Sequence, residues 1–394
     1  MDSKKFKKMG KQLFYLVNQR LPTEKAYGLQ ISKTCEALAQ KGIEVKLVYP
    51  FRINPVKEDL FSYYGVKKNF RIKKIPAIDF YLPGKSDKLS FFIKSFISAV
   101  FVTFYAIFYR ADFIYSRDEL PLYFLSFFKK NIFFEAHRFS KSRAVIRFYR
   151  RFKELNLKII VITNNLKNEF VKFGFGPENI LVAPDAVDLE EFDIDVSKEE
   201  VRKKLNLPPD KILIGYVGQL RTMGMKKGVD FAIESIKFLP KDCTLVLVGG
   251  IKKDIDYYKK LSEKENLNER ILFVGRIKHN LIPVYLKAFD ILIMPFPNIQ
   301  HYAFYMSPLK LFEYMASKRP IVATDLPTVR EVLNEENSVL VKSENLSGFV
   351  AGIKKILENS DLAEKISRNA FKDVQNYTWQ KRAEKILEFI INKI

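Results

Sequence analysis

Short apolar runs alternate with longer amphipathic segments along most of the chain. The first run, residues 12–18, is mostly apolar, as expected for a parallel strand covered on both faces. A polar loop over 23–28, a helix to about residue 41 and a second apolar strand at 44–49 follow it. This order predicts a βαβ unit near the start of the chain.

The same alternation continues to the end of the sequence. The remaining strands predicted in the first half are residues 113–115, 132–135, 158–163 and 180–183. In the second half they are residues 212–217, 244–248, 271–274, 291–295 and 321–324, each followed by a helix of amphipathic pattern. Strands that alternate with helices in this way predict an α/β fold with doubly wound parallel sheets.

Length and local composition divide the chain into two domains. At 394 residues it is too long for one typical core. We expect a Rossmann-like domain over 1–188, an acidic hinge over 189–210, a second Rossmann-like domain over 211–376, and a C-terminal helix over 377–394 that packs back on the first domain. Open α/β sheets bind ligands at the carboxyl ends of their strands, so we expect the two domains to face a central cleft that holds the site.

Two segments of the first domain carry apolar faces. Residues 95–109 form the most apolar run, which is shorter than the roughly 20 residues that cross a bilayer, and we predict a buried helix there. Residues 142–153 form an amphipathic helix with apolar side chains from Val145 to Phe152 on one face and arginines on the other. That helix would lie either in an anionic membrane interface or with its apolar face on the domain core.

The net charge of +22 is concentrated in the first half of the chain. Residues 1–185 hold 34 Lys and Arg against 16 Asp and Glu, a net of +18, and residues 186–394 hold 33 against 29, a net of +4. This asymmetry predicts an anionic partner of the first half. A membrane surface is favoured over nucleic acid because no nucleic-acid-binding motif accompanies the charge, and a solvated lysine-rich surface is the alternative.

Two features predict a cytoplasmic protein. Cys35 and Cys243 lie far apart and outside any C-x-x-C pattern, which argues against a disulfide framework and a zinc site. The first nine residues carry four lysines and no apolar core of signal-peptide length. We therefore expect a cytoplasmic location, with peripheral contact at the inner face of the cell membrane through residues 1–185.

The segment from Ser307 to Ala316 has the composition of a helix start, with Ser307 as N-cap and Pro308 at the first helical position. The free backbone N–H groups and the dipole of such a helix attract a diphosphate. Glu313 lies about 9 Å along the axis from the cap, at roughly 1.5 Å per residue, where its carboxylate can accept the hydroxyls of a ribose. The alternative is an i,i+3 pair of Glu313 with Lys310 on a solvated face.

A second cluster of candidate residues begins at the end of the strand at 212–217. Gly218 opens a glycine-rich, cationic loop that contains Arg221, Lys227 and Gly228 and is similar to a phosphate loop without matching the Walker sequence. Fixed cations there would stabilise the negative charge on a departing diphosphate, and Arg221 and Lys227 are the candidates. A structural turn is the alternative.

His137 stands just past the apolar strand at 132–135, at the edge of the sheet that faces the predicted cleft. Its imidazole would contact a sugar hydroxyl or a developing oxyanion, or shuttle a proton, and a structural histidine is the alternative. Two Asp-x-Asp triplets, at 193–195 and 254–256, fall in the hinge and at a helix start. We therefore predict no metal site and no cofactor.

These motifs, in this order, resemble the retaining GT-B glycosyltransferases of family 4, from the first βαβ unit to the last helix. The most specific part runs from Ser307 to Asp325 and is similar to the family's donor-binding helix and the strand after it. The resemblance implies that Glu313 holds the donor ribose and that the backbone at Leu309 and Lys310 cradles the diphosphate. By the same likeness, the other donor-binding and catalytic positions are Gly28, His137, Gly218, Lys227 and Val274.

Three departures from the family pattern leave the donor sugar open. Tyr305 stands where the family has the first glutamate of its E-x7-E pair. Gln219 stands where the family has an arginine after the loop glycine, so Arg221 takes that role only by hypothesis. The paired glycines of the first loop are reduced to Gly28.

Together, the motifs and the resemblance predict metal-independent transfer of a hexose or N-acetylhexosamine from a nucleoside-diphosphate sugar to a hydroxyl acceptor, with retention of configuration. The basic first domain predicts a saccharide or lipid-linked acceptor at the membrane, in cell-surface polysaccharide or glycolipid synthesis. Two alternatives stay open. One is a sugar-nucleotide epimerase or hydrolase with the same fold, and the other is a non-catalytic nucleotide-sugar-binding subunit in which Tyr305 and Gln219 mark lost catalysis.

Overall fold

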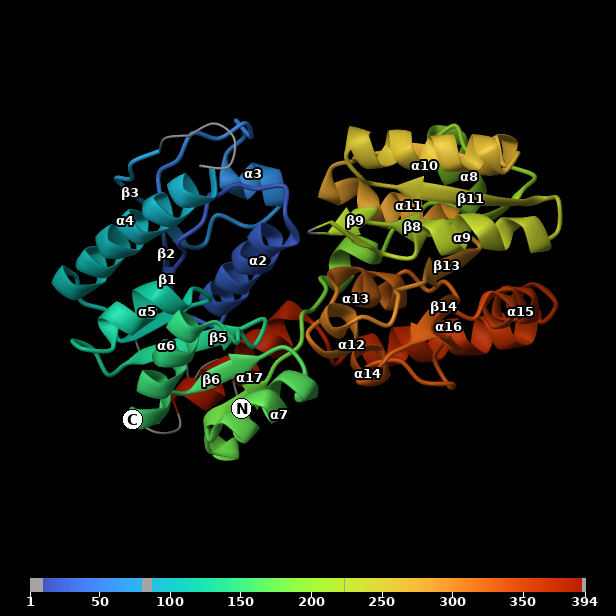
Figure 1. Ribbon diagram of the computed structural model, residues 1–394. Helices are drawn as coiled ribbons and strands as arrows, with labels where there is room; N and C mark the ends of the chain where they lie inside the picture. Colours follow the sequence, from blue (N-terminus) through green and yellow to red (C-terminus); the bar gives the residue numbers. More distant parts are fainter. Residues whose placement is uncertain (1–9, 80–86, 223, 392–394) are drawn as a thin grey trace. The chain divides into compact units, whose positions relative to one another are not determined.

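The computed structural model describes residues 10–79, 87–222 and 224–391, and the lysine-rich first nine residues lie outside this range. The chain divides into two compact units (Figure 1). The first unit runs to Pro184 and resumes at Trp379, and the second spans Asp185–Thr378. Each is built on one parallel sheet with helices on both faces, which confirms the predicted doubly wound α/β fold.

The first unit contains a seven-stranded parallel sheet in the order β3-β2-β1-β4-β5-β6-β7. Its strands are β1 (Gln12–Leu16), β2 (Glu44–Pro50), β3 (Arg71–Ile75), β4 (Phe113–Ser116), β5 (Ile132–Ala136), β6 (Ile159–Val161) and β7 (Ile180–Val182). Its helices are α2 (Ala26–Gln40), α3 (Leu60–Tyr64), α4 (Asp87–Phe108), α5 (Glu119–Leu125), α6 (Arg143–Glu154), α7 (Asn164–Phe173), η2 (Pro177–Asn179) and α17 (Trp379–Ile391). Since parallel crossovers are right-handed, α4, α5 and α6 share one face of this sheet and α2 covers the other.

The second unit contains a six-stranded parallel sheet in the order β12-β11-β8-β13-β14-β15, and a separate two-stranded hairpin. The sheet strands are β8 (Ile212–Val217), β11 (Cys243–Val248), β12 (Ile271–Gly275), β13 (Ile291–Met294), β14 (Ile321–Asp325) and β15 (Val339–Lys342), and the hairpin pairs β9 (Arg221–Thr222) with β10 (Met225–Lys226). The helices from η3 to α11 are η3 (Leu189–Phe192), α8 (Lys198–Lys204), α9 (Val229–Ser235), η4 (Ile236–Phe238), α10 (Lys252–Lys264), η5 (Asn268–Arg270), η6 (His279–Leu281) and α11 (Ile282–Ala288). Those from α12 onward are α12 (Gln300–Phe304), α13 (Leu309–Ala316), α14 (Pro327–Arg330), α15 (Leu346–Leu357) and α16 (Ser360–Val374).

Burial on both faces of the second sheet explains why its strands read as continuous apolar runs. Successive side chains of a strand point to opposite faces, and in β8 they enter two different apolar clusters. Leu213 and Val217 belong to one cluster, and Ile214 and Tyr216 belong to the other. All four side chains are at most 3% exposed.

The predicted strands are confirmed to within about two residues at their ends, but β3, β15 and the β9–β10 hairpin were not predicted. Strand β3 has the sequence RIKKI, and Ile75 is its one fully buried residue. It lies at the edge of the first sheet, where one face and one backbone edge are open. Charged side chains are tolerated at such an edge. Because of them β3 is not an apolar run, and the apolar pattern does not predict it.

The segment expected to be an irregular hinge, residues 189–210, is structured and lies within the second unit. It forms η3 and α8, and Ser197 and Glu200 close a capping box at the start of α8. Reciprocal capping of this kind fixes a helix start even in a short, charged sequence. The change of unit falls instead between Pro184 and Asp185.

A helix covers the segment predicted at 95–109, but it is buried on one side only. Helix α4 begins at Asp87 and is 22 residues long. Its side chains Phe92, Phe104 and Phe108 are 68%, 52% and 78% exposed. The residues that face the sheet are instead small or polar, so the most apolar side chains of the helix lie on its outer face.

Helix α6 resolves the alternative that its amphipathic pattern left open. Tyr149 and Phe152, from its apolar face, are 0% exposed and pack among the aromatic rings of the first unit. The guanidinium groups of Arg143 and Arg147 lie on the exposed side. The apolar face of α6 is therefore part of the core.

Arg382 makes several of the contacts that hold the last helix, α17, to the first unit. Arg382 is 5% exposed, and its Nη2 lies 2.9 Å from Oε1 of Glu135, which is fully buried on β5. Its Nη1 donates to Thr34 Oγ1 at 3.2 Å, and its Nε donates to the carbonyl of Pro184 at 3.0 Å. These contacts join the end of the chain to α2, to β5 and to the last residue before the change of unit.

Replacing Arg382 by methionine should destabilise the first unit by about 3–5 kcal/mol, because it leaves the carboxylate of Glu135 buried without its cation. Urea unfolding measures this change. The exposed Lys385 lies on the same helix, and its replacement by methionine is a matched control that should stay within about 0.5 kcal/mol of the wild type. Adding Glu135→Gln to the Arg382 variant should restore part of the loss, and additive effects of the two changes would contradict the assigned pair.

Candidate functional site

The strand order of the second sheet reverses between β8 and β13, and the loop of candidate residues begins there. Gly218 follows β8 with φ +130°, and Gly228 ends the loop with φ +77°. A Cβ on Gly228 would stand 1.7 Å from the carbonyl oxygen of Pro295, just past β13. Only glycine permits this contact, so the turn at Gly228 holds Lys227 at the carboxyl end of β13.

Lys310 is a buried cation in this place. Its side chain leaves the first turn of α13, is 7% exposed, and lies beside Gly218, where an added Cβ would be 3.2 Å from Nζ. Nζ stands 3.6 Å from the centre of the Tyr216 ring and has no hydrogen-bond partner among the described residues. Burial and the nearby charge of Lys227 hold the pKa of Lys310 well below its usual range, against a smaller opposite effect of Glu313.

Lys227 and His301 extend this group of basic side chains. Burial lowers the pKa of Lys227 to about 8. Burial also lowers the pKa of His301, and the charge of Lys227 adds to that effect. The charge of Lys227 disfavours protonation of both Lys310 and His301, and within the described parts of the chain no carboxylate is bonded to Lys310, so the group favours the binding of an anion.

Glu313 lies one turn further along α13 and is 6% exposed. Its Oε1 is 3.1 Å from Nε2 of His279, in η6 beyond the end of β12. Nδ1 of His279 lies 3.9 Å from Glu191. The alternative in which Glu313 pairs with Lys310 on a solvated face is therefore wrong, because both side chains are buried and the imidazole is the partner of Glu313.

The predicted helix start needs a correction. Helix α13 begins at Leu309, and Pro308 is the residue before it, with extended backbone (φ −80°, ψ 127°) and no side-chain cap. Ser307 is not the N-cap, because its Oγ accepts a hydrogen bond from the backbone N–H of Asp185 at 2.9 Å. The first backbone N–H groups of α13, at Leu309 and Lys310, are thus not capped by a side chain.

Arg221 and Val274 lie at different edges of this region. The guanidinium of Arg221, in β9, stacks 4.2 Å from the ring centre of Tyr257 and 5.6 Å from that of Tyr258, both in α10. The guanidinium of Arg221 thus packs against aromatic rings of α10. Val274 is partly buried near the end of β12, and the following Gly275 accepts a hydrogen bond from the N–H of Gly249.

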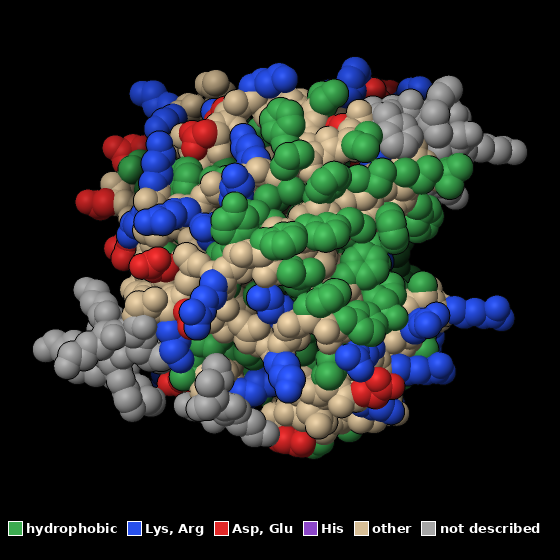
Figure 2. Space-filling model, turned by 90° about the vertical axis from the view of Figure 1, so that its left-hand side faces the viewer, with side chains coloured by type: hydrophobic (Ala, Val, Ile, Leu, Met, Phe, Trp, Pro, Cys, Tyr) green, Lys and Arg blue, Asp and Glu red, His purple; other side chains and the backbone are tan. Residues whose placement is uncertain are grey.

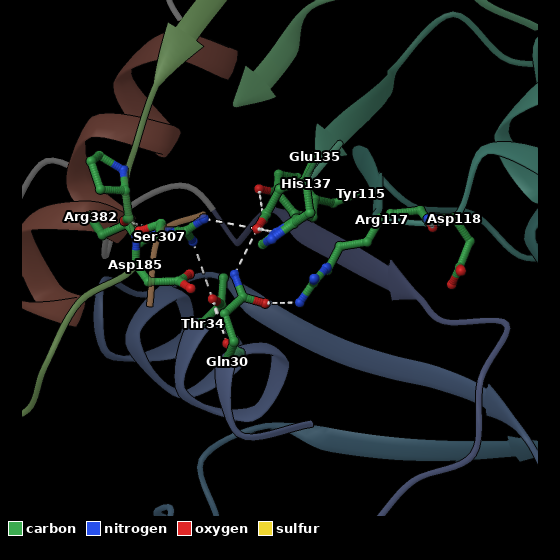
Figure 3. Close-up of polar contacts among 12 residues, drawn as sticks. Gln30, Thr34, Tyr115, Arg117, Asp118, Glu135, His137, Asp185, Ser307 and Arg382 are labelled. Atoms are coloured by element: carbon green, nitrogen blue, oxygen red, sulfur yellow. Dashed lines mark hydrogen bonds and ion pairs between the residues drawn. The ribbon is translucent and has the colours of Figure 1, made fainter. Parts of the chain in front are cut away.

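His137 belongs to the first unit, where it follows β5 beside a buried carboxylate (Figure 3). Its Nε2–H donates to Oε1 of Glu135 at 2.6 Å. The carboxylate of Glu135 also accepts from Gln30 Nε2 at 2.6 Å and from the hydroxyl of Tyr115. Burial alone would raise the pKa of Glu135, but Arg382 and then His137 outweigh it and hold that pKa well below its usual range.

The protonation state of His137 follows from this network. Burial, and then the charge of Arg117, lower the pKa of His137 to about 4 in spite of the neighbouring carboxylate of Glu135. The imidazole is neutral at pH 7 and carries its one ring proton on Nε2. This N–H donates a hydrogen bond to the carboxylate of Glu135. Nδ1 consequently has no proton to donate, and it is suited to accept a hydrogen bond from a hydroxyl group.

Gly28 is not in a loop, because α2 begins at Ala26. A Cβ at this position would stand 1.9 Å from the hydroxyl oxygen of Tyr64. That hydroxyl accepts from the N–H of Thr23 and donates to its carbonyl, both at 2.7 Å. Close packing of Tyr64 against the helix therefore accounts for this glycine, whatever else it contacts.

The structure brings Gly218, Lys227, Lys310 and Glu313 together in the second unit and places His137 and Gly28 in the first. The sequence did not point to His279, His301 or Glu135. The signal for Glu135 was a carboxylate inside the apolar strand IFFEA, and the signal for His279 was its place just past the end of a predicted strand. Arg382 had no local signal, since it is 247 residues from Glu135.

Comparison with known proteins shows similarity to glycosyltransferases. The family model described as Glycosyl transferases group 1 matches residues 197–373. An uncharacterized glycosyltransferase of Methanocaldococcus jannaschii is 24% identical over 234 residues, 58% of each chain. The lipopolysaccharide core biosynthesis mannosyltransferase LpsB of Rhizobium meliloti is 31% identical over 175 residues, 42% of this chain and 46% of that protein. The chain thus spans about half the length of the curated relatives it matches.

Solved structures extend the likeness to the fold of both units. Alr3699/HepE of Anabaena, in complex with UDP and glucose, has a TM-score of 0.74 at 16% identity, and the match covers 98% of this chain and 100% of that one. WaaG, a glycosyltransferase involved in lipopolysaccharide biosynthesis, has a TM-score of 0.69 at 16% identity over 96% and 99% of the two chains. The predicted GT-B fold is confirmed, and the predicted cleft between the domains stays a prediction.

Replacing Lys310 by methionine should stabilise the ligand-free protein while it abolishes binding of a diphosphate. Methionine fills a similar volume and removes a buried amino group, and burial together with the charge of Lys227 disfavours the charged form of that group and lowers its pKa. We expect a gain on the order of 1–2 kcal/mol in unfolding free energy. Thermal unfolding without ligand, and with UDP, measures both effects.

The matched control is Lys226→Met, which removes an exposed lysine from the same region, 54% exposed and paired with Asp230. It should change stability and ligand binding little. A loss of stability in the Lys310 variant would contradict the reading of that side chain as a cation held in place for an absent anion.

Proposed function

We propose that this chain, which belongs through residues 197–373 to the glycosyl transferases group 1 family, transfers a sugar from a nucleoside-diphosphate donor to a hydroxyl acceptor. The observation that carries the proposal is the buried ammonium of Lys310, without a hydrogen-bond partner among the described residues and beside Lys227 at the point where the strand order reverses. A diphosphate supplies the charge that this place lacks. The match of the family model to residues 197–373 supports the relation that the stretch from Ser307 to Asp325 first suggested.

Each side chain of the second unit has a part in the proposed donor site. Lys227 and Lys310 bind the diphosphate and neutralise it as the bond from the sugar C1 to phosphate oxygen breaks. The carboxylate of Glu313, oriented by His279, accepts hydrogen bonds from the ribose hydroxyls. Arg221 was predicted to share the work of Lys227, but its stacking on Tyr257 supports a role in holding the loop.

His137 contacts the reacting sugar in this proposal. Because Nε2–H is committed to Glu135, Nδ1 accepts a hydrogen bond from a sugar hydroxyl. The neutral imidazole then orients the sugar and does not serve as a general acid. The new bond forms between C1 and the acceptor oxygen as the bond from C1 to the phosphate oxygen breaks, and the acceptor proton passes to the departing diphosphate.

The finer points of the proposal follow from the resemblance. We propose a hexose or N-acetylhexosamine donor, retention of configuration and no metal ion. The relatives whose names mention lipopolysaccharide core and teichuronic acid biosynthesis support a saccharide or lipid-linked acceptor in cell-surface polysaccharide or glycolipid synthesis. The basic first half of the chain supports a cytoplasmic protein that meets its acceptor at the inner face of the membrane.

A direct test combines a donor screen with a transfer assay. A thermal-shift screen over UDP-, GDP- and ADP-sugars identifies the donor, since a ligand stabilises the native state in proportion to the logarithm of its concentration above the dissociation constant. The labelled donor is then incubated with the protein and a membrane extract. Label in the lipid-soluble fraction supports transfer, conversion of the free nucleotide sugar supports an epimerase or hydrolase, and binding without turnover supports a non-catalytic subunit.

Glu313→Gln should weaken binding of the donor nucleotide by about tenfold, because the amide offers one acceptor where the carboxylate offers two oxygens. The sharper expectation concerns selectivity. Wild-type protein should prefer the ribonucleotide over its 2′,3′-dideoxy analogue, and the variant should discriminate much less. Calorimetric titration of both nucleotides into both proteins tests this, and unchanged discrimination would remove Glu313 from the ribose.

Diphosphate affinity should fall as the pH rises above about 8. Burial lowers the pKa of Lys227 to about 8 in the ligand-free protein, and a bound diphosphate raises it by favouring the charged form. Above that pH, binding must take up a proton, so the dissociation constant should increase by up to about tenfold per pH unit. Titrations of UDP between pH 7 and 9 measure the slope, and Lys227→Arg, which stays charged, should reduce it to the part that Lys310 contributes.

A further inference from the structure

Helix α4 and the turn after α5 present a row of exposed phenylalanines on the first unit. Phe92 and Phe108 are 68% and 78% exposed, far above what a core helix of this composition would show. The row, here called the aromatic face, consists of Phe92, Phe96, Phe104, Phe108, Phe127 and Phe128. Figure 2 shows hydrophobic side chains gathered in a band across this side of the molecule. Contiguous apolar surface of this kind marks a binding site.

The two parts of the aromatic face are joined through α5. The rings of Phe96 in α4 and Phe124 in α5 meet edge to face at 5.8 Å. Tyr123 continues the contact to Phe127, with ring centres 5.3 Å apart. The phenylalanines of the turn and of the helix therefore belong to one surface.

The inner side of α4 carries polar groups that are bonded to other parts of the first unit. Lys94 pairs with Asp79 at 3.5 Å, and both side chains are 6% exposed. Asn18 Nδ2 donates to the carbonyl of Ser95 at 2.9 Å. Arg52 Nη2 donates to the hydroxyl of Ser98 at 3.0 Å. The inner side thus combines bonded polar groups with the apolar side chains of Ala99, Val102 and Ala106, while the phenylalanines of the aromatic face lie outward.

This arrangement separates a helix that lies on a membrane from one that crosses it. Residues Leu89–Phe108 are long and apolar enough to cross a membrane by length and composition alone. Crossing would require the buried pair of Lys94 and Asp79, and the partners of Ser95 and Ser98, to be given up. Insertion of the outer side chains alone leaves all of these contacts in place.

Basic side chains border the aromatic face. Helix α6, which packs beside α5, exposes Arg143, Arg147 and Arg150. The guanidinium of Arg151 lies 4.8 Å from the ring centre of Phe127. Figure 2 also shows Lys and Arg side chains beside the hydrophobic band. An apolar band with a cationic border is the surface that matches an anionic bilayer, with lipid chains below and phosphates above.

We propose that the aromatic face inserts into the interface of an anionic lipid bilayer, with α4 lying in the membrane plane and the α6 arginines on the headgroups. The inference deepens the membrane contact in the proposed function and rests on that function only for the identity of the acceptor. It assigns the contact to inserted phenylalanines, in addition to the general positive charge of the first half. A second copy of the chain is a poorer occupant, because a symmetric dimer through this face would bring two arginine borders together.

The first test is vesicle flotation. The full-length protein is mixed with phosphatidylcholine vesicles that contain or lack phosphatidylglycerol, at low and at high salt. Wild-type protein should float with the anionic vesicles. Phe92→Ser combined with Phe96→Ser and Phe104→Ser should lower the partition coefficient by about 100-fold or more, since full burial of each phenylalanine contributes roughly tenfold or more. High salt should weaken the binding of the wild type without abolishing it.

The matched control removes exposed apolar residues from the second unit. Phe238 and Ile251 are 54% and 50% exposed, and their double replacement by serine should leave flotation unchanged. Equal losses in the control and in the α4 variant would overturn the assignment. So would retained flotation of the α4 variant, or flotation that is lost entirely at high salt.

A second measurement is independent of the folding of the triple variant. Phe104→Trp is a conservative change at a 52% exposed position, and Trp379, the natural tryptophan, is 4% exposed. Fluorescence of the variant should shift to the blue on vesicle addition and be quenched by brominated lipid chains, relative to wild type. A spectrum unchanged by vesicles would overturn the proposal. So would a dimer that dissociates on Phe→Ser replacement, as shown by light scattering, with no vesicle binding by the wild type.

The outcomes for the membrane face and for the donor site are distinguishable. Nucleotide binding is measured without vesicles, and vesicle binding without nucleotide. The triple α4 variant should keep the thermal shift that UDP or another donor nucleotide produces in the wild type. Loss of flotation with that shift intact supports the membrane face, even if no sugar transfer is found.

Discussion

The central strands of both sheets are covered on their two faces, and this constraint decides where chemistry can occur. Inside such a sheet, a polar side chain must be fully bonded or absent, because water does not reach it. The strand ends are the first positions where backbone N–H groups and charged side chains can meet a ligand. In the second unit, Gly218 and Gly228 bring two strand ends close enough to hold Lys227 and Lys310 in one place. The donor site thus follows from the way the sheet is wound.

The two units treat a buried charge in opposite ways. In the first, the carboxylate of Glu135 is met by Arg382, Gln30, Tyr115 and His137, so its charge is balanced and its position fixed. In the second, the ammonium of Lys310 has an aromatic ring beside it and no hydrogen-bond partner among the described residues. A balanced charge stabilises a fold, whereas an unbalanced one destabilises it until an anion arrives. This difference is the physical reason to look for the diphosphate at Lys310.

Apolar periodicity predicted most of the sheets but not their edges or their long-range bonds. Strands such as β8 and β13 could be predicted because both their faces are buried. Strand β3 could not be predicted, because its charged residues lie at an open edge. The donor helix could be predicted from the residues between Pro308 and Glu313, but its start was predicted wrongly. The hydroxyl of Ser307 accepts a hydrogen bond from the N–H of Asp185, 122 residues away, and does not cap the helix. Partners so distant in sequence, like Arg382 for Glu135, leave no local pattern.

Helix α4 is a second case in which contacts distant in sequence decide what the local pattern cannot predict. Its composition is that of a core helix, and a prediction from hydropathy alone buries it, but its small and polar residues fall on the side that meets the sheet. Lys94, Ser95 and Ser98 can be satisfied there because Asp79, Asn18 and Arg52 reach them from other elements. Once those bonds have fixed the inner side, the phenylalanines have no place except outward. In water, the outward phenylalanines are not stabilised by burial of their apolar surface, whereas insertion into a bilayer interface would bury that surface. The polar contacts beneath α4 therefore orient the phenylalanines toward a membrane.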